Sequence, residues 1–380
     1  MKQIAIKTFI CDLLQLAGIT PNGSEAWDIQ IHNEDFYTRV FNEGSLGLGE
    51  SYMEGWWDCP SLDQFFDRII TADIESKVQF NKWLWPKLLL LKLLNFQTKK
   101  RALVVGVKHY DLGNDLFQEM LDQRMNYTCG YWANANDLEA AQLNKLELSC
   151  QKLMLKPGMR VLDIGCGFGS LAKYAVENYG VSVVGITISK EQYQYAQTNC
   201  AGLPVEIRFQ DYRDVQEKFD RIVSLGMFEH VGHLNYRTYM QKVSDCLHED
   251  GLFLLHTIGN KETYITCDAW INKYIFPNGL APSMRQISRA SEGLFIMENW
   301  ANFGAYYDNT LMAWEANFER NWVHLKTQYD EMFYRMWRYY LLACAGSFRS
   351  RNMQLWQIVF SKHGIRGGYQ VPLFDGRIKN

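Results

Sequence analysis

Short apolar runs alternate with longer amphipathic stretches through the middle of the chain. The runs have the length expected of strands buried on both faces, and they predict strands at 160–164, 181–187, 205–210, 219–225 and 252–258. Helical patterns fit between them, as at 171–178 and 190–200. Because crossovers of this length join parallel strands, we expect an α/β fold with a doubly wound parallel sheet. Its ligands should bind beyond the carboxyl ends of the strands.

The same pattern changes toward both ends of the chain. Two later runs, 295–303 and 355–360, predict an antiparallel pair at the sheet edge, and long helices are expected between 309 and 345. Before the sheet the pattern is mostly helical, with Asn, Gly and Pro at its breaks. The prediction is therefore a small helical domain at 1–97, a basic linker at 98–112 and a larger catalytic domain at 113–380.

One helical stretch of the first domain is a candidate for contact with lipid. Residues 83–96 (WLWPKLLLLKLLNF) are rich in Leu and Trp, Lys82 precedes them, and the basic cluster 99–101 follows. An interfacial helix of this kind inserts its apolar side among lipid headgroups, and basic residues add attraction to an anionic surface. The alternative is a helix buried in the small domain or in a dimer contact.

Composition narrows the function classes. The net charge of −3 argues against a nucleic-acid-binding protein, so any attraction to a membrane has to be local. Nine cysteines without a C-x-x-C pair signal neither a disulfide framework nor a zinc site, which fits a reducing cytosol. No secretory signal and no apolar run of about 18 residues is present. Aromatic residues make up 14% of the chain, which suits an apolar or cationic ligand.

The glycines after the first strand are the clearest sign of a ligand site. Asp163 precedes a G-x-G-x-G sequence formed by Gly165, Cys166, Gly167 and Gly169. A dinucleotide site would place a carboxylate about twenty residues further on, and 185–187 contain none. The loop is similar to the cofactor loop of class I S-adenosylmethionine (SAM) methyltransferases. The alternative is a glycine-rich turn without a ligand.

Polar residues after the next two strands complete the predicted cofactor site. They are Thr187, Ser189 and Gln192 after the second strand, and Gln210, Asp211 and Tyr212 after the third. Hydroxyl and amide groups could bond the ribose, while Asp211 could accept from the adenine amino group and Tyr212 could cover the ring. For Asp211 the alternative is an exposed turn residue.

Five motifs give the chain a family resemblance. They are HYDLGND at 109–115, YTC at 127–129, GMFEHVG at 226–232, LHTIG at 255–259 and WINKYIFP at 270–277. From about residue 100 onward the chain resembles the cyclopropane-fatty-acyl-phospholipid synthases and mycolic acid cyclopropane synthases. The resemblance implies a class I SAM methyltransferase fold, a Rossmann-like, mostly parallel seven-stranded sheet. It also implies transfer of a methylene group from SAM to the cis double bond of a phospholipid acyl chain.

The chemistry implied by the resemblance needs a base and a dry pocket. An alkene is a poor nucleophile, so it has to be held in line with the SAM methyl group away from water. Aromatic faces can stabilise the resulting carbocation, and the candidates are Tyr274, Phe276, Phe303, Tyr306 and Tyr307. In the family a bound bicarbonate ion is thought to take the proton that allows the ring to close.

By resemblance, a set of polar groups would hold that bicarbonate ion: Cys129, Glu229, His256, the backbone of Ile258, and Tyr307. The alternatives are a helix-capping role for Glu229 and a satisfied core position for His256. Tyr127 and Thr128 would touch the methionine end of SAM. Cys344 matches a cysteine once considered a nucleophile, although a cysteine on an apolar helix more often packs in a core.

The expected partners follow from the same resemblance. The substrate would be an unsaturated phospholipid at a membrane surface, and the protein would be a cytoplasmic homodimer peripherally associated with the inner membrane. Two alternatives stay open. A related enzyme could quench the cation differently and give methyl-branched or hydroxylated chains, and a catalytically silent protein could bind only SAM or lipid.

Overall fold

The computed structural model describes residues 2–74 and 113–373. They belong to two compact units. Unit 1 comprises Met1–Leu94, Cys267–Pro277 and Leu311–Met353, and unit 2 comprises Asn95–Thr266, Asn278–Thr310 and Gln354–Asn380. The segment predicted to contact lipid, 83–96, and the linker 98–112 lie outside the described residues. None of the helices described has both the length and the apolar character needed to cross a bilayer.

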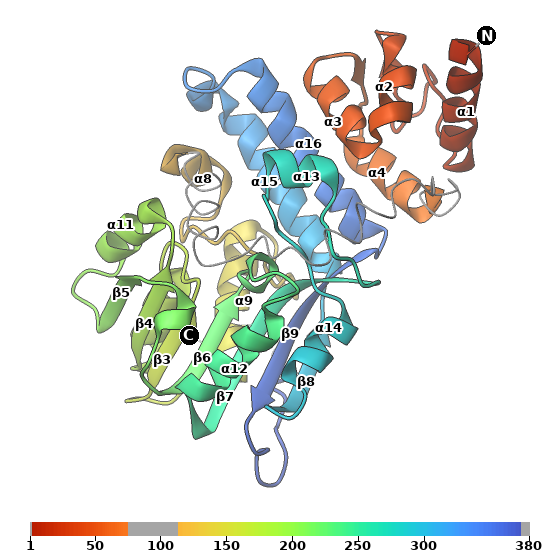
Figure 1. Ribbon diagram of the computed structural model, residues 1–380. Coiled ribbons are helices and arrows are strands. Elements are labelled where there is room, and N and C mark those ends of the chain that lie inside the picture. Colours follow the sequence, from red (N-terminus) through yellow and green to blue (C-terminus); the bar gives the residue numbers. More distant parts are fainter. Residues whose placement is uncertain (1, 75–112, 374–380) are drawn as a thin grey trace. The chain divides into compact units, whose positions relative to one another are not determined.

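The described part of unit 2 is built on a seven-stranded sheet of order β5-β4-β3-β6-β7-β9-β8 (Figure 1). The strands are β3 (Arg160–Ile164), β4 (Ser182–Thr187), β5 (Val205–Phe209), β6 (Phe219–Leu225), β7 (Leu247–Asn260), β8 (Ile296–Asn302) and β9 (Met353–Ser361). The first five pair in parallel, and β8 and β9 pair antiparallel. The predicted parallel sheet and its antiparallel edge pair are therefore confirmed.

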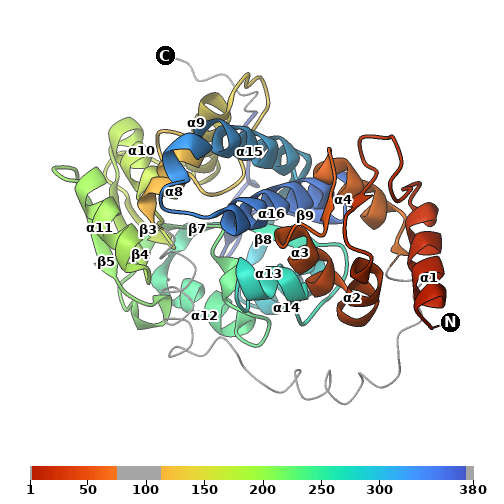
Figure 2. The same ribbon diagram turned by 90° about the horizontal axis from the view of Figure 1, so that it is seen from above.

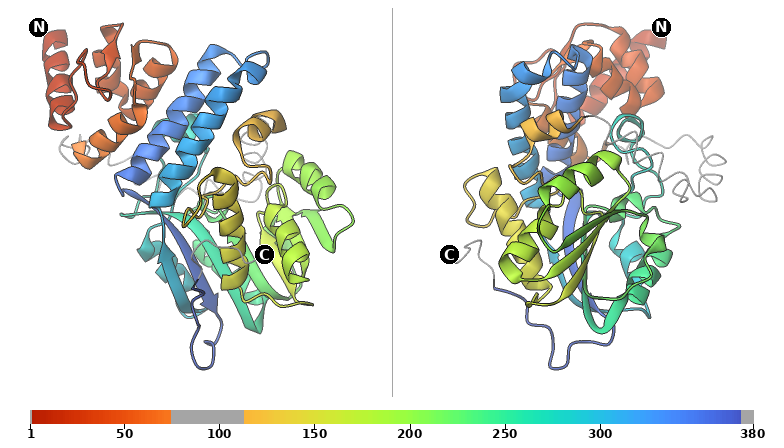
Figure 3. Two further views of the ribbon diagram at one scale, coloured as in Figure 1. Left: turned by 180° about the vertical axis from the view of Figure 1, so that it is seen from behind. Right: turned by 90° about the vertical axis from the view of Figure 1, so that its left-hand side faces the viewer.

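Helices cover both faces of this sheet (Figure 3). The helices in the described part of unit 2 are α8 (Asn114–Met120), α9 (Leu138–Lys152), α10 (Ser170–Tyr179), α11 (Lys190–Asn199), α12 (Tyr236–Cys246) and α14 (Met284–Ser291), with short 3-10 helices η2 (Tyr212–Asp214) and η3 (Phe228–His230). Successive residues of a strand point to opposite faces. Val161 accordingly packs in the core under α9 and α10, whereas Leu162 packs in the core under α12 and α14.

Local sequence signals explain where α9 and α10 begin and end. The Asp137 side chain accepts a hydrogen bond from the Ala140 N–H at the start of α9, which satisfies one of the free donors of its first turn. Helix α10 ends at Gly180, which adopts a left-handed conformation and donates its N–H to the Val176 carbonyl. These caps stabilise the start of α9 and the end of α10.

The described part of unit 1 is helical. Its elements are α1 (Lys2–Leu16), α2 (Asp35–Glu43), α3 (Ser45–Met53), α4 (Leu62–Thr71), α13 (Ala269–Tyr274), most of α15 (Ala305–Leu325), α16 (Glu331–Arg349) and a small ladder of β1 (Gln30–Ile31) with β2 (Trp57–Asp58). Helices α3 and α4 pack against α16, and α13 packs against α3 (Figure 2). Arg335 fastens this packing by donating to the carbonyls of Tyr52 and Trp57.

Candidate functional site

The glycine loop follows β3 directly and keeps its backbone open to a ligand. Gly165, Gly167 and Gly169 have φ angles of 81°, 54° and 84°, a region that side chains disfavour. Among the described residues, no atom lies within 4 Å of the position that a Cβ on Gly167 would take. The amide groups of Gly165 and the buried Cys166 donate to the Ile186 carbonyl, which ties the loop to β4. A ligand can therefore lie against the backbone at Gly167, whereas Met227 and Cys200 occupy the space beside Gly165 and Gly169.

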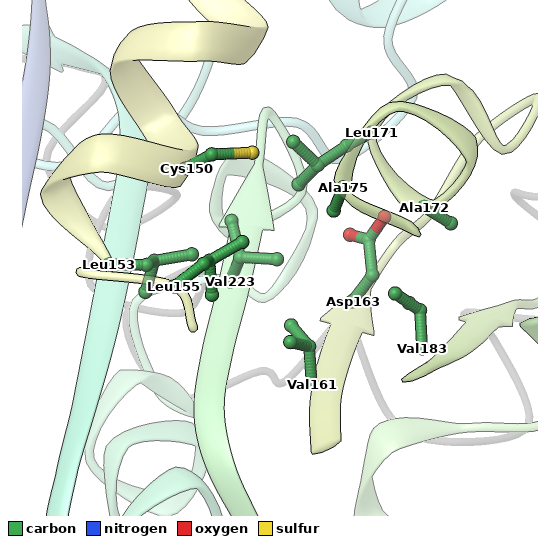
Figure 4. A pocket seen from close by; sticks show the side chains of 10 residues that line it. All are labelled: Cys150, Leu153, Leu155, Val161, Asp163, Leu171, Ala172, Ala175, Val183 and Val223. Carbon is green, nitrogen blue, oxygen red and sulfur yellow. The ribbon is translucent and has the colours of Figure 1, made fainter. Parts of the chain in front are cut away.

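Asp163, the carboxylate before the glycines, is buried in β3 and points toward α10 (Figure 4). It lines a cavity of about 10 Å³, enough for one water molecule, whose other lining residues are apolar side chains and Cys150. Burial raises the pKa of Asp163 to about 7, although the nearby cation of Lys145 opposes this shift. Its predicted contact with the cofactor stays a prediction.

The residues after β4 hold one another in place. The Thr187 hydroxyl donates to Gln192 Oε1 over 3.0 Å, and the Ser189 hydroxyl caps α11 by accepting from the Gln192 N–H. Gln210 N donates to the Thr187 carbonyl, which joins the end of β5 to this group. The predicted ribose-binding side chains thus form one buried hydrogen-bonded cluster at the carboxyl end of β4.

The two residues after Gln210 differ in their surroundings. Asp211 accepts two hydrogen bonds from the Arg213 guanidinium, both at 2.8 Å, so this carboxylate already has a cationic partner. The Tyr212 ring is buried in the core, with its centroid 5.0 Å from that of Tyr239. This position favours a structural role for Tyr212 over the predicted role of covering adenine.

The segment that contains Tyr127 and Thr128 is fastened to α9. Gln142 donates to the Thr128 carbonyl over 2.8 Å, and Lys145 donates to the Thr128 hydroxyl over 3.0 Å. A Cβ on Gly226, at the end of β6, would lie 2.6 Å from the Thr128 methyl group. Thr128 therefore sits at the carboxyl end of the sheet, and only glycine allows this close approach. Tyr127 packs its ring 5.1 Å from the ring of Phe117 in α8.

Cys129 is fully buried at the start of the next turn. Burial raises the pKa of its thiol well above the usual range, and the Thr310 hydroxyl lies 3.9 Å from Sγ. Thr310 also accepts from the Gly130 N–H and from the Trp132 indole, which fastens this turn to α15. A thiol held neutral in this way suits a wall of a pocket better than a nucleophile.

Glu229 lies in η3, just after β6, and is buried. Its Oε1 accepts from the Ile258 N–H over 2.7 Å, whereas Oε2 is buried without a hydrogen-bond partner among the described residues. Burial raises the pKa of Glu229 to about 7. Since a buried polar atom without a partner is costly, Oε2 marks a place where a ligand can bond. The Ile258 N–H, predicted to face the anion, is bonded to Glu229 instead.

His256 lies in β7, two residues before Ile258, and is also buried. Its Nδ1 is 3.2 Å from Gln357 Nε2, and within the described part of the chain its Nε2 has no hydrogen-bond partner. Burial, with the cations of Lys145 and Lys152, lowers the pKa of His256 well below its usual value. The imidazole is therefore neutral near pH 7, and a bound ligand could supply the partner that Nε2 lacks.

Aromatic rings surround this end of the sheet in unit 2. The Phe303 ring centroid lies 6.0 Å from that of His256 and 5.4 Å from that of Tyr131, which is also 5.4 Å from Tyr306. Tyr307 is buried in the first turn of α15. Tyr274 and Phe276 belong to unit 1.

Cys344 also belongs to unit 1, in α16, whereas Glu229 and His256 belong to unit 2. Burial raises the pKa of its thiol to about 12, so the thiolate needed for nucleophilic attack is scarce at neutral pH.

Four residues around the site escaped the sequence analysis: Tyr131, Lys145, Thr310 and Gln357. Tyr131 follows the YTC motif by two positions and could have been found from it. The other three belong to no motif, and only their burial in the structure draws attention to them: none is more than 1% exposed.

Comparisons with known proteins agree with this geometry. The family model described as mycolic acid cyclopropane synthetase matches residues 97–358. The chain belongs to this family. It is 56% identical over 360 residues to the cyclopropane-fatty-acyl-phospholipid synthase of Escherichia coli K12, covering 95% of this chain and 94% of the relative. It is 36% identical to a probable fatty acid methyltransferase of Pseudomonas putida over 70% of each chain. The family resemblance read from the motifs is confirmed.

Solved structures of the family share the fold. Mycolic acid cyclopropane synthase CmaA1, complexed with SAH and CTAB, matches with a TM-score of 0.65 and 32% identity over 68% of this chain and 98% of that one. Coclaurine N-methyltransferase matches with a TM-score of 0.69 over 83% of this chain and 99% of that one. Its identity is 20%, so this likeness concerns the fold alone. The class I SAM methyltransferase fold is therefore confirmed.

Proposed function

We propose that this chain transfers a methylene group from SAM to the cis double bond of unsaturated acyl chains in membrane phospholipids, which gives cyclopropane fatty acyl chains. The 56% identity to a synthase of that name over nearly the whole chain supports the activity. The structural observation that carries it is a pair of buried polar atoms that have no hydrogen-bond partner among the described residues, Glu229 Oε2 and His256 Nε2.

The glycine loop and its neighbours fit SAM. When bound, SAM supplies the methyl group that becomes the ring carbon. The loop backbone is free of neighbouring side chains at Gly167, and Tyr127 and Thr128 would meet the methionine end. Thr187, Ser189 and Gln192 would hold the ribose. The Asp211 carboxylate would accept from the adenine amino group as well as from Arg213.

Glu229 Oε2 and His256 Nε2 fit a bicarbonate ion, which when bound supplies a base. His256 Nε2 would donate to an anionic oxygen, and Glu229 Oε2 would accept the hydroxyl proton of bicarbonate. Ile258 would act by orienting Glu229, since its N–H already donates to Oε1. Tyr307 would contribute a hydroxyl, and the neutral thiol of Cys129 would form part of the wall. We assign no reactive role to Cys344.

Aromatic side chains would keep water away from the reacting alkene. Phe303 lies beside His256, and Tyr131 and Tyr306 cluster with Phe303; the faces of such rings stabilise positive charge without reacting with it. This arrangement suits chemistry that passes through a cation on the acyl chain.

The protein would act at the cytoplasmic surface of the inner membrane as a homodimer, with 1–97 as the region that contacts lipid or the second subunit. Flotation with anionic vesicles tests the first part, and sedimentation equilibrium tests the second. Loss of binding at high salt is expected, because clustered basic residues act through screened charges.

Mass analysis of acyl chains tests the activity. The full-length protein is incubated with SAM and vesicles of a cis-unsaturated phospholipid. Cyclopropanation predicts a gain of one CH₂ with loss of the alkene, and Glu229→Gln should abolish it while the exposed Glu177→Gln on α10 does not. A gain of CH₂ with the alkene retained would contradict the proposal and indicate methyl branching. Binding of SAM without product would indicate a silent binding protein.

A further inference from the structure

Helix α9 buries a row of polar side chains. Gln142, Lys145, Ser149 and Lys152 recur every three or four residues, so they share one face of the helix, and none is more than 2% exposed. Two of these side chains, Gln142 and Lys145, bond Thr128. The third, Ser149, is connected to His256 through hydrogen bonds of Gln357 in β9.

The direction of each hydrogen bond in that path follows from its first member. The Lys145 carbonyl can only accept, so the Ser149 hydroxyl donates its one proton to it, over 2.7 Å. The Ser149 oxygen is then an acceptor toward Gln357, and the group facing it over 3.2 Å has to be the Gln357 amide nitrogen. That same NH₂ group lies 3.2 Å from His256 Nδ1. Nδ1 is therefore the acceptor, and the imidazole proton is on Nε2.

We infer that Gln357, oriented by Ser149, is a positioning residue that holds His256 in the Nε2–H form. The inference rests on the proposed function for its purpose, since an Nε2–H is what a bound anion needs. It concerns a proton location that can be measured without any ligand. His256 Nε2 is thereby a donor rather than an acceptor.

The surrounding charges agree with this assignment. Lys145 and Lys152 face the imidazole from α9, and both disfavour a second proton on it. Lys152 Nζ lies 5.8 Å from the Phe303 ring, beside the same histidine. On the other side, Glu229 is bonded to Ile258 of the same strand as His256. Gln357 is fully buried, so water does not compete for Nδ1.

The test is nitrogen NMR of the full chain labelled with ¹⁵N-histidine. The signals of His256 are those that vanish in His256→Asn. In the wild type near pH 7 we expect Nδ1 to give the signal of an unprotonated nitrogen and Nε2 that of a protonated one. A protonated Nδ1 in the wild type would overturn the inference, whether or not any variant folds.

In Gln357→Glu, the group that faces His256 Nδ1 changes from a hydrogen-bond donor to an acceptor. The nearby Lys145 and Lys152 favour the ionised carboxylate, which can only accept, so Nδ1 should become protonated. The matched control is Gln354→Glu on the same strand, whose side chain bonds Asn302 and Trp356 and should leave the His256 signals unchanged. Nδ1 remaining unprotonated in Gln357→Glu would overturn the inference.

A second readout separates this inference from the proposed function. In Gln357→Glu, the bicarbonate concentration for half-maximal turnover should rise on the order of ten-fold or more, as for other residues that orient a ligand-binding histidine. Absence of cyclopropane product from the wild type would overturn the proposed function and leave the NMR result standing. An unchanged bicarbonate requirement alongside a reversed proton location would contradict the positioning role.

Discussion

Helices α9 and α10 cover the same face of the sheet, but only α9 buries a row of polar side chains along its length. Helix α10 buries apolar residues against the strands, among them Leu171, Ala172, Ala175 and Val176. Helix α9 buries Leu146 and Cys150 in the same core, but it also buries the polar row that contains Gln142, Lys145, Ser149 and Lys152.

The difference shows what each helix contributes. Burying apolar area stabilises a fold by about 25 cal/mol per Å², whereas a buried polar group costs stability unless it is hydrogen-bonded. Three residues of the polar row of α9 are bonded toward the carboxyl end of the sheet: Gln142 and Lys145 reach Thr128, and Ser149 reaches His256 through Gln357. The fourth, Lys152, has no hydrogen-bond partner for Nζ among the described residues. Helix α10 therefore serves mainly stability, and α9 serves mainly the site.

Leu171→Ala on α10 should have the largest effect on stability. Leu171 is buried beside the cavity that Asp163 lines, so truncation enlarges a void and should lower the free energy of unfolding by about 2–5 kcal/mol. Turnover per folded molecule should stay close to that of the wild type. Urea unfolding measures the first quantity, with the exposed Leu234→Ala as the control. A large loss of turnover without loss of stability would contradict the statement that α10 serves mainly stability.

Lys145→Met should change how stability depends on pH. Burial lowers the pKa of Lys145 from 10.5 to about 8. Between these values the unfolded chain holds the proton and the folded chain has released it, so the free energy of unfolding rises with pH, by up to about 3 kcal/mol. The variant lacks this rise, while Lys152 titrates in both proteins. Urea unfolding at pH 8, 9 and 10 measures the difference, and parallel curves would contradict it.

Gln142→Leu should have a smaller effect that falls on the site. The substitution keeps the size of the side chain and leaves the Thr128 carbonyl without its donor, which costs about 1 kcal/mol of stability. Because Thr128 is predicted to contact SAM, the dissociation constant for SAM should rise several-fold. Isothermal titration calorimetry measures it. An unchanged affinity would remove Gln142 from the group of residues that serve the site.

Cys344→Ala should have the smallest effect. The residue belongs to unit 1, and with a pKa near 12 its thiol stays protonated. Turnover should change by less than about two-fold, because a protonated thiol is a poor nucleophile. Steady-state kinetics on vesicles measure this change. A loss of a hundred-fold or more would restore the nucleophile hypothesis.

The sequence predicted the sheet well where a strand is a short run of mostly apolar residues. The bounds of β3 and β6 match the predicted 160–164 and 219–225. Strand β7 is longer than the predicted 252–258, because it continues through the exposed polar residues 248–250. A hydrophobic pattern cannot detect a strand segment that faces water, although backbone pairing extends it.

Only those residues of the site that belong to sequence motifs were predicted. Glu229 and His256 were named from their motifs, whereas the polar row of α9 was not. Polar residues every three or four positions are typical of the solvent-facing side of a helix. Only the fold shows that Gln142, Lys145 and Ser149 face inward. Asp211 and Tyr212 illustrate the converse, since sequence order placed them correctly after β5 but could not reveal their contacts with Arg213 and Tyr239.

We propose that Glu229 and His256 hold a bicarbonate ion used in cyclopropane formation. The most direct test of this claim is mass analysis of acyl chains after incubation with SAM and unsaturated vesicles, in buffer stripped of bicarbonate and in the same buffer with bicarbonate restored. We expect the amount of cyclopropane product to fall sharply without bicarbonate and to return with it, and we expect no such response in Glu229→Gln. Full product formation in stripped buffer would contradict the claim.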